Sequence, residues 1–159
     1  MPAQKLKRFL DENAIRYVSI QHSPAFTAQE VAASAHIPGR ELAKTVVVKL
    51  DGTMAMVVLP ATRKLDLDQL EQVTGAHTAS LAGEKEFQAM FPDCDPGAMP
   101  PFGNLYGLRV FVDETLALDE QIAFNAGTHA ELLQMDFDDF QRLVKPTIAP
   151  LAWRVKTPA

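Results

Sequence analysis

The stretch KTVVVKLDGTMAMVVL, residues 44–59, is the strongest indication of fold in this 159-residue chain. Two runs rich in β-branched and apolar residues flank Asp51-Gly52, which is the strongest short signal for a β-hairpin. A two-residue turn pairs Leu50 with Thr53, Val48 with Ala55, Val46 with Val57 and Lys44 with Leu59, all on one sheet face. Lys44 therefore ends an apolar stripe.

Further elements are expected on both sides of this hairpin. The pattern predicts a helix over 4–13, a strand over 16–22, a helix over 28–35 opened by the capping box Thr27 and Glu30, and a short helical turn over 40–43. Beyond the hairpin it predicts helices over 66–73 and 84–91, a Pro- and Gly-rich loop over 92–107, strands over 108–112, 121–125 and 130–134, and a helix from the Asp136 cap to before Pro146. This order indicates a mixed α/β (α+β) fold, with helices around a mixed sheet, in a single domain over 1–159.

Composition narrows the possible functions. The net charge of −5 and pI near 5.3 disfavour a protein that grips a long phosphate backbone, so any nucleic-acid contact should be local and DNA is not expected. Apolar runs are far shorter than the roughly 20 residues that span a bilayer, and residues 1–10 do not resemble a signal peptide. One cysteine allows no internal disulfide. We expect a cytoplasmic protein without membrane contact.

Two segments could carry chemistry at the rim of the sheet. Lys44 ends an apolar stripe, and an ammonium group at such a rim could bind a phosphate or a carboxylate. A surface lysine without function, whose side chain extends along the apolar surface to reach water, would occupy the same position. The loop over 95–103 contains prolines that fix its backbone, and Gly97 and Gly103 permit close approach of a ligand. Its N–H groups could stabilise an oxyanion. A rigid connector without function would have the same sequence.

A third candidate is the segment over 124–129, in which a strand ends at a glycine turn that brings Thr128 and His129 to one rim. His129 could orient water or a ribose hydroxyl, but a lone histidine after a turn is commonly a surface residue. His22 is interpreted as an edge histidine on the inward face of its strand, beside Ile20. His36 and His77 are expected in loops.

Several other mechanisms lack their sequence signatures. There is no Gly-x-Ser-x-Gly elbow, no dinucleotide- or phosphate-binding glycine motif, and no histidine pair with metal-ligand spacing. Cys94 lies between Asp93 and Asp95, whose carboxylates would raise the pKa of its thiol and oppose thiolate formation. A cysteine nucleophile is therefore not expected.

Together these three candidates resemble the YbaK/prolyl-tRNA synthetase-associated editing domain family. The resemblance rests on Lys44 opening Lys-Thr-Val-Val-Val, the Gly-x-x-x-Pro stretch over 97–101, and Gly127-Thr128-His129. It extends over nearly the whole chain, including His22-Ser23-Pro24 and the capping box. It implies a twisted, partly barrel-like mixed sheet and hydrolysis, without a metal, of the ester that joins an amino acid to the 3′-terminal adenosine of a tRNA.

The resemblance also implies roles for individual residues. Lys44 would hold the terminal nucleotide, the Gly97 backbone would line the amino-acid pocket, and His129 would form its other wall as the third catalytic position. Substrate-binding positions are expected at Val46, Ala98, Met99, Pro100, Pro101, Asn125, Gly127 and Thr128, with Thr45 as a neighbour. A local positive rim for the acceptor end of tRNA would consist of Arg40, Lys44, Arg63 and Lys64.

The substrate and the partner remain open at this stage. A small amino acid, alanine or serine/threonine, is favoured over cysteine, and prolyl-tRNA synthetase is a possible partner of a protein expected to be monomeric. A non-catalytic small-ligand or synthetase-binding module of the same fold, a Cys-tRNA deacylase and a hydrolase of other small acyl esters are the alternatives. Editing exists because one missing methylene gives a synthetase only about 1–3 kcal/mol of discrimination.

Overall fold

The computed structural model describes residues 4–21, 37–95 and 97–153. The helices are α1 (Gln4–Glu12), α3 (Leu67–Thr74), α4 (Glu84–Gln88) and α5 (Phe137–Val144), with 3-10 helices η1 (Gly103–Tyr106) and η2 (Leu116–Leu118). The strands are β1 (Tyr17–Gln21), β2 (Leu42–Leu50), β3 (Thr53–Pro60), β4 (Ala79–Leu81), β5 (Val110–Asp113), β6 (Gln121–Asn125), β7 (Glu131–Asp136) and β8 (Thr147–Ala149). The predicted helix over 28–35 and His22 lie outside the described residues.

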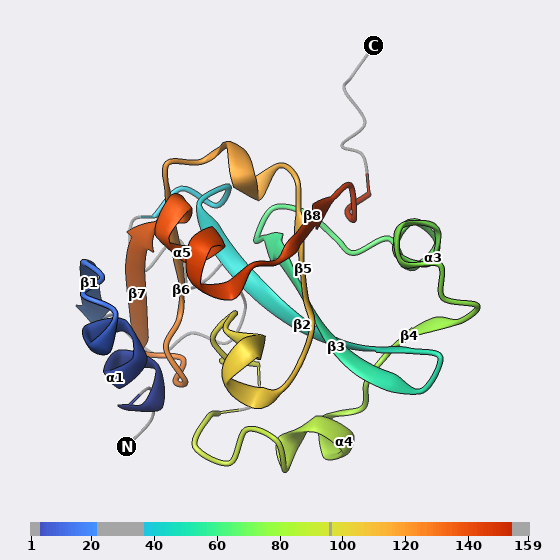
Figure 1. Ribbon diagram of the computed structural model, residues 1–159, viewed down its shortest axis with the longest axis horizontal. Coiled ribbons are helices and arrows are strands. Elements are labelled where there is room, and N and C mark those ends of the chain that lie inside the picture. The colour runs from blue at the N-terminus through green and yellow to red at the C-terminus, as the bar shows by residue number, and fades with distance from the viewer. Residues whose placement is uncertain (1–3, 22–36, 96, 154–159) are drawn as a thin grey trace.

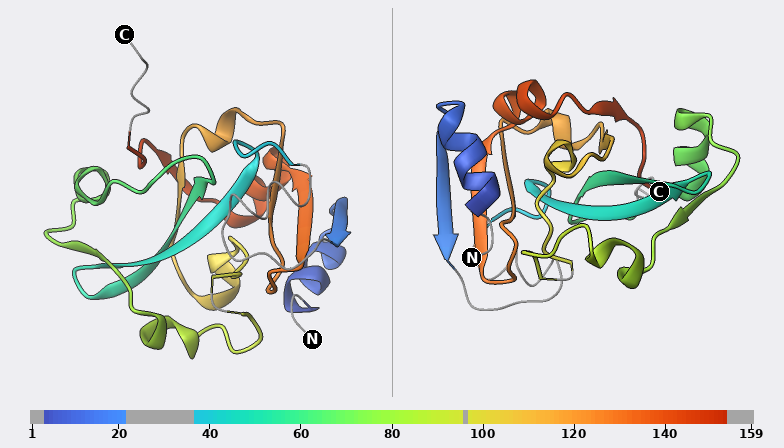
Figure 2. Two further views of the ribbon diagram at one scale, coloured as in Figure 1. Left: turned by 180° about the vertical axis from the view of Figure 1, so that it is seen from behind. Right: turned by 60° about the horizontal axis from the view of Figure 1, so that its bottom comes forward.

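All eight of these strands form one mixed sheet in the order β1-β7-β6-β2-β3-β5-β8, with β4 paired to β2. The β6–β2, β3–β5 and β5–β8 pairs are parallel and the other pairs are antiparallel. Figure 1 places α1 at the β1 end of the sheet and α3 at the opposite end, near β4 and β8, and Figure 2 shows the same arrangement from two other sides. The expected mixed α/β architecture is confirmed.

The hairpin at the centre of the sheet has the predicted register. Leu50 pairs with Thr53, Val48 with Ala55, Val46 with Val57 and Lys44 with Leu59. The turn residues Asp51 and Gly52 have φ values of 50° and 85°, and two consecutive positive φ angles match the right-handed twist of the strands that the turn joins. The stripe that ends at Lys44 packs on α3 and the 151–152 segment, while the opposite face meets the main core.

Several local predictions are corrected by long-range pairing. The helical turn expected over 40–43 is wrong, because a turn over 39–41 leads directly into β2, where Leu42 and Ala43 pair with β6. The helix expected over 84–91 ends at Gln88, although Phe91 is buried as predicted. Val18, which by strand alternation shares the face of Ile20 that was expected to point inward, is 57% exposed. The short strands β4 and β8 and the 3-10 helix η1 were not predicted.

The remaining elements lie close to their predicted positions. The helix capped by Asp66 ends one residue later than predicted, at Thr74 before the left-handed Gly75, and the Asp66 carboxylate accepts a hydrogen bond from Gln69 N. Strand β6 has the predicted bounds, and α5 begins after Asp136 as expected. Over the described ranges, no helix has the length and apolar character needed to cross a bilayer.

An aromatic cluster at the centre of the main core holds the loop over 98–103 in place. Phe102 is fully buried, and its ring centroid lies 6.3 Å from that of Phe9, 5.5 Å from Phe124 and 5.4 Å from Phe140. These rings come from α1, β6 and α5. Edge-on and tilted aromatic pairs at such distances stabilise beyond the area that they bury. Phe102 thus attaches the candidate loop to three elements.

We expect Phe102→Ala to lower the free energy of unfolding by about 3–5 kcal/mol, because the cavity left by a buried ring collapses only in part. Val18→Ala, at the 57% exposed position on β1, serves as the control and should change it by no more than about 0.5 kcal/mol. Urea unfolding followed by circular dichroism measures both. Equal midpoints for the two variants would contradict the central role of Phe102.

Candidate functional site

Lys44 is held half-buried on a rigid strand. It pairs with Leu59 across the hairpin, and its face of the sheet is covered by the second hydrophobic cluster. Burial lowers the pKa of the Lys44 ammonium, and the nearby positive charge of Lys64 lowers it further. Two neighbouring cations, one of them partly desolvated, create a site that gains free energy when an anion enters.

The sheet splits next to Lys44. Parallel pairing between β2 and β6 includes Leu42–Ala123 and Ala43–Phe124 and then stops. The following residues are Lys44 on β2 and Asn125 on β6, which by strand alternation lie on the same face as Leu42 and Ala123. Lys44 is the third residue of β2 and Asn125 is the last residue of β6, so the two strands part here. The structure thus places Lys44 and Asn125 together at the point where β2 and β6 separate, which we call the split.

The backbone groups of Thr45 lie on the edge of β2 that faces the split. On this edge of β2, Glu41 C=O accepts from Ala123 N at 2.9 Å and Val47 C=O accepts from Ala82 N at 3.0 Å. Because backbone groups alternate between edges with a period of two residues, Thr45 N–H and C=O point to the same edge, between these two bonds. The pairing recorded for this edge ends at Ala43 and resumes at Val47.

Two buried polar side chains lie next to the split, Asn125 on the face of Lys44 and Thr45, by strand alternation, on the opposite face. Within the described part of the chain, Thr45 Oγ1 and Asn125 Oδ1 are buried without a hydrogen-bond partner. A buried oxygen without a partner costs roughly 1–3 kcal/mol, so such atoms are usually explained by a bound water or ligand. Thr45 was predicted only as a neighbour, because nothing local in the sequence shows that its strand changes partners there.

Two distant loops bring Gly97 and His129 together. Asp95 N donates to Gly127 O at 2.7 Å, and Gly127 N donates to Ala98 O at 2.9 Å. Gly97 has φ of 81°, and a Cβ built on it would lie 3.5 Å from His129 Cε1. A side chain at position 97 would therefore be strained and would fill the space against the imidazole.

The other expected substrate-binding residues differ in their burial and in whether their backbone N–H groups are available to a ligand. Ala98, Pro100 and Pro101 are buried, and Met99 belongs to the main core. The N–H groups of Gly127 and Ala98 are used within the loops, the latter by Asp95 O at 3.0 Å, and prolines have none. Val46 and Thr128 are half-buried, and Thr128 Oγ1 accepts from Ala130 N at 3.3 Å.

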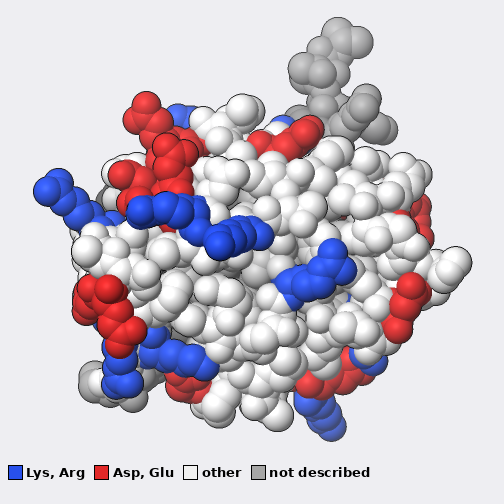
Figure 3. All heavy atoms as spheres, in the orientation of Figure 1, with Lys and Arg blue, Asp and Glu red and all other residues white. Residues whose placement is uncertain are grey.

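The basic residues expected to form a positive rim have different surroundings. Lys64 is exposed and close enough to lower the pKa of Lys44, and Arg63 precedes it in the chain. The exposed Arg40 acts on Asp119, whose pKa is raised by burial and by Glu41 and lowered by Arg40. On the face seen in Figure 3, basic side chains are interspersed with acidic ones and with uncharged surface.

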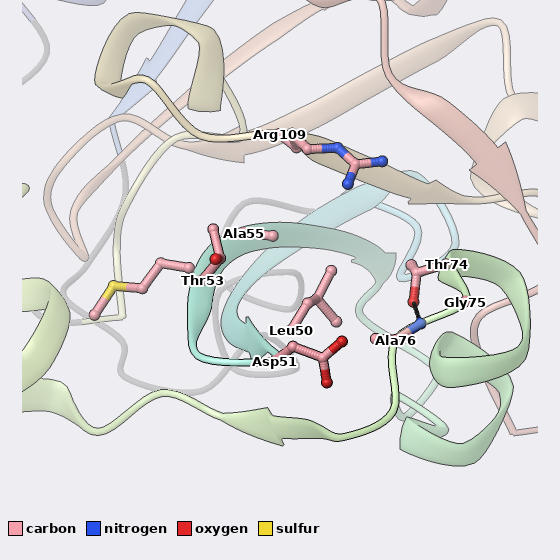
Figure 4. A pocket seen from close by; sticks show the side chains of 9 residues that line it. Leu50, Asp51, Thr53, Ala55, Thr74, Gly75, Ala76 and Arg109 are labelled. Atoms are coloured by element: carbon pink, nitrogen blue, oxygen red, sulfur yellow. Dashed lines mark hydrogen bonds between the residues drawn. The ribbon is translucent and has the colours of Figure 1, made fainter.

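A separate cavity of about 240 Å³ lies at the other end of β2 from Lys44. Figure 4 shows the Arg109 guanidinium on one side of it and the Asp51 carboxylate on another, between the hairpin turn and the end of α3. Asp51 accepts from Thr78 N and His77 N, and these bonds lower its carboxyl pKa. Asp51 is therefore a bonded acceptor and not a poised base, which makes this cavity a weaker candidate for catalysis than the split.

Sequence comparison identifies the family. The sequence model of the aminoacyl-tRNA editing domain matches residues 22–143. The chain belongs to this family. The resemblance inferred from Lys44, the Gly-x-x-x-Pro stretch and Gly127-Thr128-His129 is thus confirmed.

Relatives and solved structures agree with this assignment. The editing domain is 28% identical to the multifunctional Ser/Thr-tRNA deacylase ProXp-y of Escherichia coli, over 91% of this chain and 89% of the relative. It is 25% identical to the prolyl-tRNA editing protein ProX of Acetoanaerobium sticklandii, over 86% of each chain. A crystal structure of a candidate trans-editing enzyme for prolyl-tRNA synthetase superposes with a TM-score of 0.81 at 20% identity, covering 96% of this chain and 97% of the other.

The thiol of Cys94 is unsuited to catalysis, as predicted. Burial raises its pKa to about 11, with a further contribution from Asp93, and Tyr106 Oη lies 3.9 Å from the sulfur. The prediction had named only the flanking carboxylates, whereas burial is the larger cause.

At pH 8, a cysteine with this pKa holds roughly two orders of magnitude less thiolate than a free cysteine. We therefore expect alkylation of native Cys94 by iodoacetamide to be about 100-fold slower than that of the urea-unfolded chain, measured by mass spectrometry over time. The rate should still be rising between pH 9 and pH 11. Equal native and unfolded rates at pH 8 would contradict the raised pKa.

Proposed function

We propose that this editing domain hydrolyses the ester bond of a mischarged aminoacyl-tRNA, acting as a stand-alone, single-domain enzyme over residues 1–159. The observation that supports it most directly is the split between β2 and β6, where the partly desolvated Lys44 shares a sheet face with Asn125, whose Oδ1 is buried without a hydrogen-bond partner among the described residues. The names of the two relatives support deacylation, and the family assignment supports tRNA as the partner.

The residues suggest how each part of the substrate is held. The Lys44 ammonium binds the phosphate or ribose of the terminal adenosine, since it is a cation at a rim already made positive by Lys64. Asn125 completes its hydrogen bonds with the substrate, which recovers the cost of burying its side-chain oxygen. His129 and the Gly97 backbone flank the aminoacyl group, where the glycine leaves room for a small side chain.

The reaction requires little from the protein beyond positioning. A water oxygen adds to the ester carbonyl carbon, and the backbone N–H of Gly97 stabilises the oxyanion of the tetrahedral intermediate. The carbon–oxygen bond to the ribose then breaks, the ribose oxygen takes up a proton, and a free amino acid leaves with intact tRNA. No nucleophilic side chain is needed, which agrees with the inert Cys94 thiol.

Alanine and serine/threonine are the proposed amino acids, and the name of the Escherichia coli relative supports the second pair. We further propose action in the cytoplasm as a monomer, with prolyl-tRNA synthetase as a partner and with Arg40, Arg63 and Lys64 contacting the acceptor end. The proposed substrate pocket also includes Val46, Ala98, Met99, Pro100, Pro101, Gly127 and Thr128.

The function is tested with tRNAs mischarged with alanine, serine, threonine or cysteine, together with correctly charged prolyl-tRNA. We expect rapid release of alanine or serine/threonine, slower release of cysteine, and no release of proline above the rate without protein. Radiolabelled amino acids measure the rates. If the protein bound these tRNAs and released none of the amino acids, it would be a non-catalytic module, and release from simple acyl esters alone would point to a different hydrolase.

Lys44→Ala should slow deacylation about 100-fold or more, in the range seen when one electrostatic contact to a reacting group is removed. Lys49→Ala is the matched control, because Lys49 lies in the same strand on the opposite face, where it pairs with Glu86 at 2.9 Å. Initial rates on the preferred mischarged tRNA compare the two. Equal losses of activity would remove Lys44 from the site.

Lys44→Met separates function from stability. Because burial lowers the pKa of folded Lys44, the charged lysine opposes folding at every pH below that lowered pKa, and the effect disappears as pH rises to the ordinary lysine value. We therefore expect Lys44→Met to be inactive but at least as stable as the parent at pH 7 in urea unfolding. A strongly destabilised variant would indicate a structural role for Lys44.

A further inference from the structure

We propose that Trp153 is a stacking platform for the unpaired 3′ tail of the tRNA, near the split between β2 and β6 where the terminal adenosine is proposed to bind. This inference rests on the proposed function and extends it from the terminal nucleotide to those that precede it. It assigns a role to a residue that no motif singled out.

Trp153 is an indole held at a defined place on the surface. Its side chain is 57% exposed, although tryptophan is usually well buried. Its backbone N–H donates to Lys64 O at 2.8 Å, and the preceding Ala152 bridges to Leu65. Two backbone links therefore fix Trp153 beside the basic pair Arg63 and Lys64.

The segment that carries Trp153 is anchored by a buried carboxylate. Asp113 is 2% exposed, and its Oδ1 accepts from Leu151 N at 2.9 Å and from Ala152 N at 3.2 Å. Leu151 is fully buried in the second hydrophobic cluster. The indole is exposed while the chain leading to it is rigid. Stacking of a base on the indole therefore costs little conformational entropy in the protein.

The platform lies on the same side of the sheet as Lys44. The second hydrophobic cluster joins Leu151, Ala152 and Leu65 to Val46, which shares the face of Lys44 on β2. Lys64, whose carbonyl accepts the Trp153 N–H, is near enough to lower the pKa of Lys44. A strand of nucleic acid with its end at Lys44 would therefore have its preceding nucleotides near Lys64 and Trp153.

The charges around the platform favour a neutral base over a phosphate. A cavity of about 530 Å³ is lined by Trp153 and Arg63 together with the acidic Asp66, Asp113 and Glu114. Two of these carboxylates already accept backbone N–H groups, from Gln69 and from Leu151. This acidic wall repels phosphate, and the exposed Glu114 can accept a hydrogen bond from the exocyclic amine of cytosine or adenine, while Arg63 and Lys64 suit the backbone of the strand.

Trp153 is the single tryptophan of the chain, so its fluorescence reports on stacking directly. The probe is an uncharged tRNA ending in CCA, compared with the same tRNA shortened by these three nucleotides. We expect the intact tRNA to quench Trp153 emission and the shortened one to leave it nearly unchanged. Equal quenching by both, or none by either, would overturn the proposal.

Affinity provides a second readout that does not depend on fluorescence of the indole. Anisotropy of a 5′-labelled tRNA should give a dissociation constant about 10-fold higher for Trp153→Ala, within the range for loss of one stacked base. Trp153→Phe should regain most of the affinity, because a phenyl ring still stacks. Val18→Ala, a substitution at an equally exposed position on β1, should bind like the parent. Parental affinity of Trp153→Ala would refute the platform.

Salt dependence separates the platform from its basic neighbours. Arg63→Gln with Lys64→Gln should reduce the slope of log affinity against log salt by about 1–2, whereas Trp153→Ala should leave it unchanged, because stacking releases no counterions. A changed slope for Trp153→Ala would contradict stacking. Since uncharged tRNA is used throughout, a chain that binds the tail but hydrolyses nothing would refute the proposed function and keep the platform.

Discussion

Along one of its edges, strand β2 changes pairing partner from β6 to β4, and the geometry of the candidate site depends on that change. Its other edge is paired with β3 without interruption, from Ala43–Pro60 to Leu50–Thr53. The edge that changes partner pairs with β6 at Leu42 and Ala43 and with β4 from Val48 to Leu50. Backbone N–H and C=O groups need partners in a protein interior, so a break in a central strand is costly unless something else enters it. That requirement makes the break the natural place for a ligand.

The two hydrophobic clusters on opposite faces of the hairpin make this break rigid. One is built around Phe102 and the other around residues such as Val57 and Leu70, so β2 has little freedom to close the gap. The free protein holds Lys44 near Lys64 and leaves the Thr45 hydroxyl unsatisfied in the described residues. These features oppose stability, and features of this kind are typical of functional sites, where binding of a substrate offsets their cost.

Sequence reasoning succeeded where structure is set by neighbours in the chain and failed where distant segments meet. The turn over 40–43 had helical propensity, but Leu42 and Ala43 gain more by pairing with β6 and entering the core. Strands β4 and β8 have three residues each, too few to show a period. Val18 has the alternation of an inward residue, yet β1 is an edge strand and leaves it exposed.

Local signals in the sequence were enough to specify the hairpin and its register, the caps of α3, the mixed fold class and the family, because these depend on turn chemistry, alternation and spacing within short segments. They also indicated Lys44, Gly97 and His129 as candidate site residues. Three contacts became visible only in the folded chain: Gly97 against His129, Lys44 beside Asn125 where the sheet splits, and Trp153 next to Lys64. Each of these contacts joins segments far apart in the chain, and their meeting depends on how the whole sheet pairs and packs.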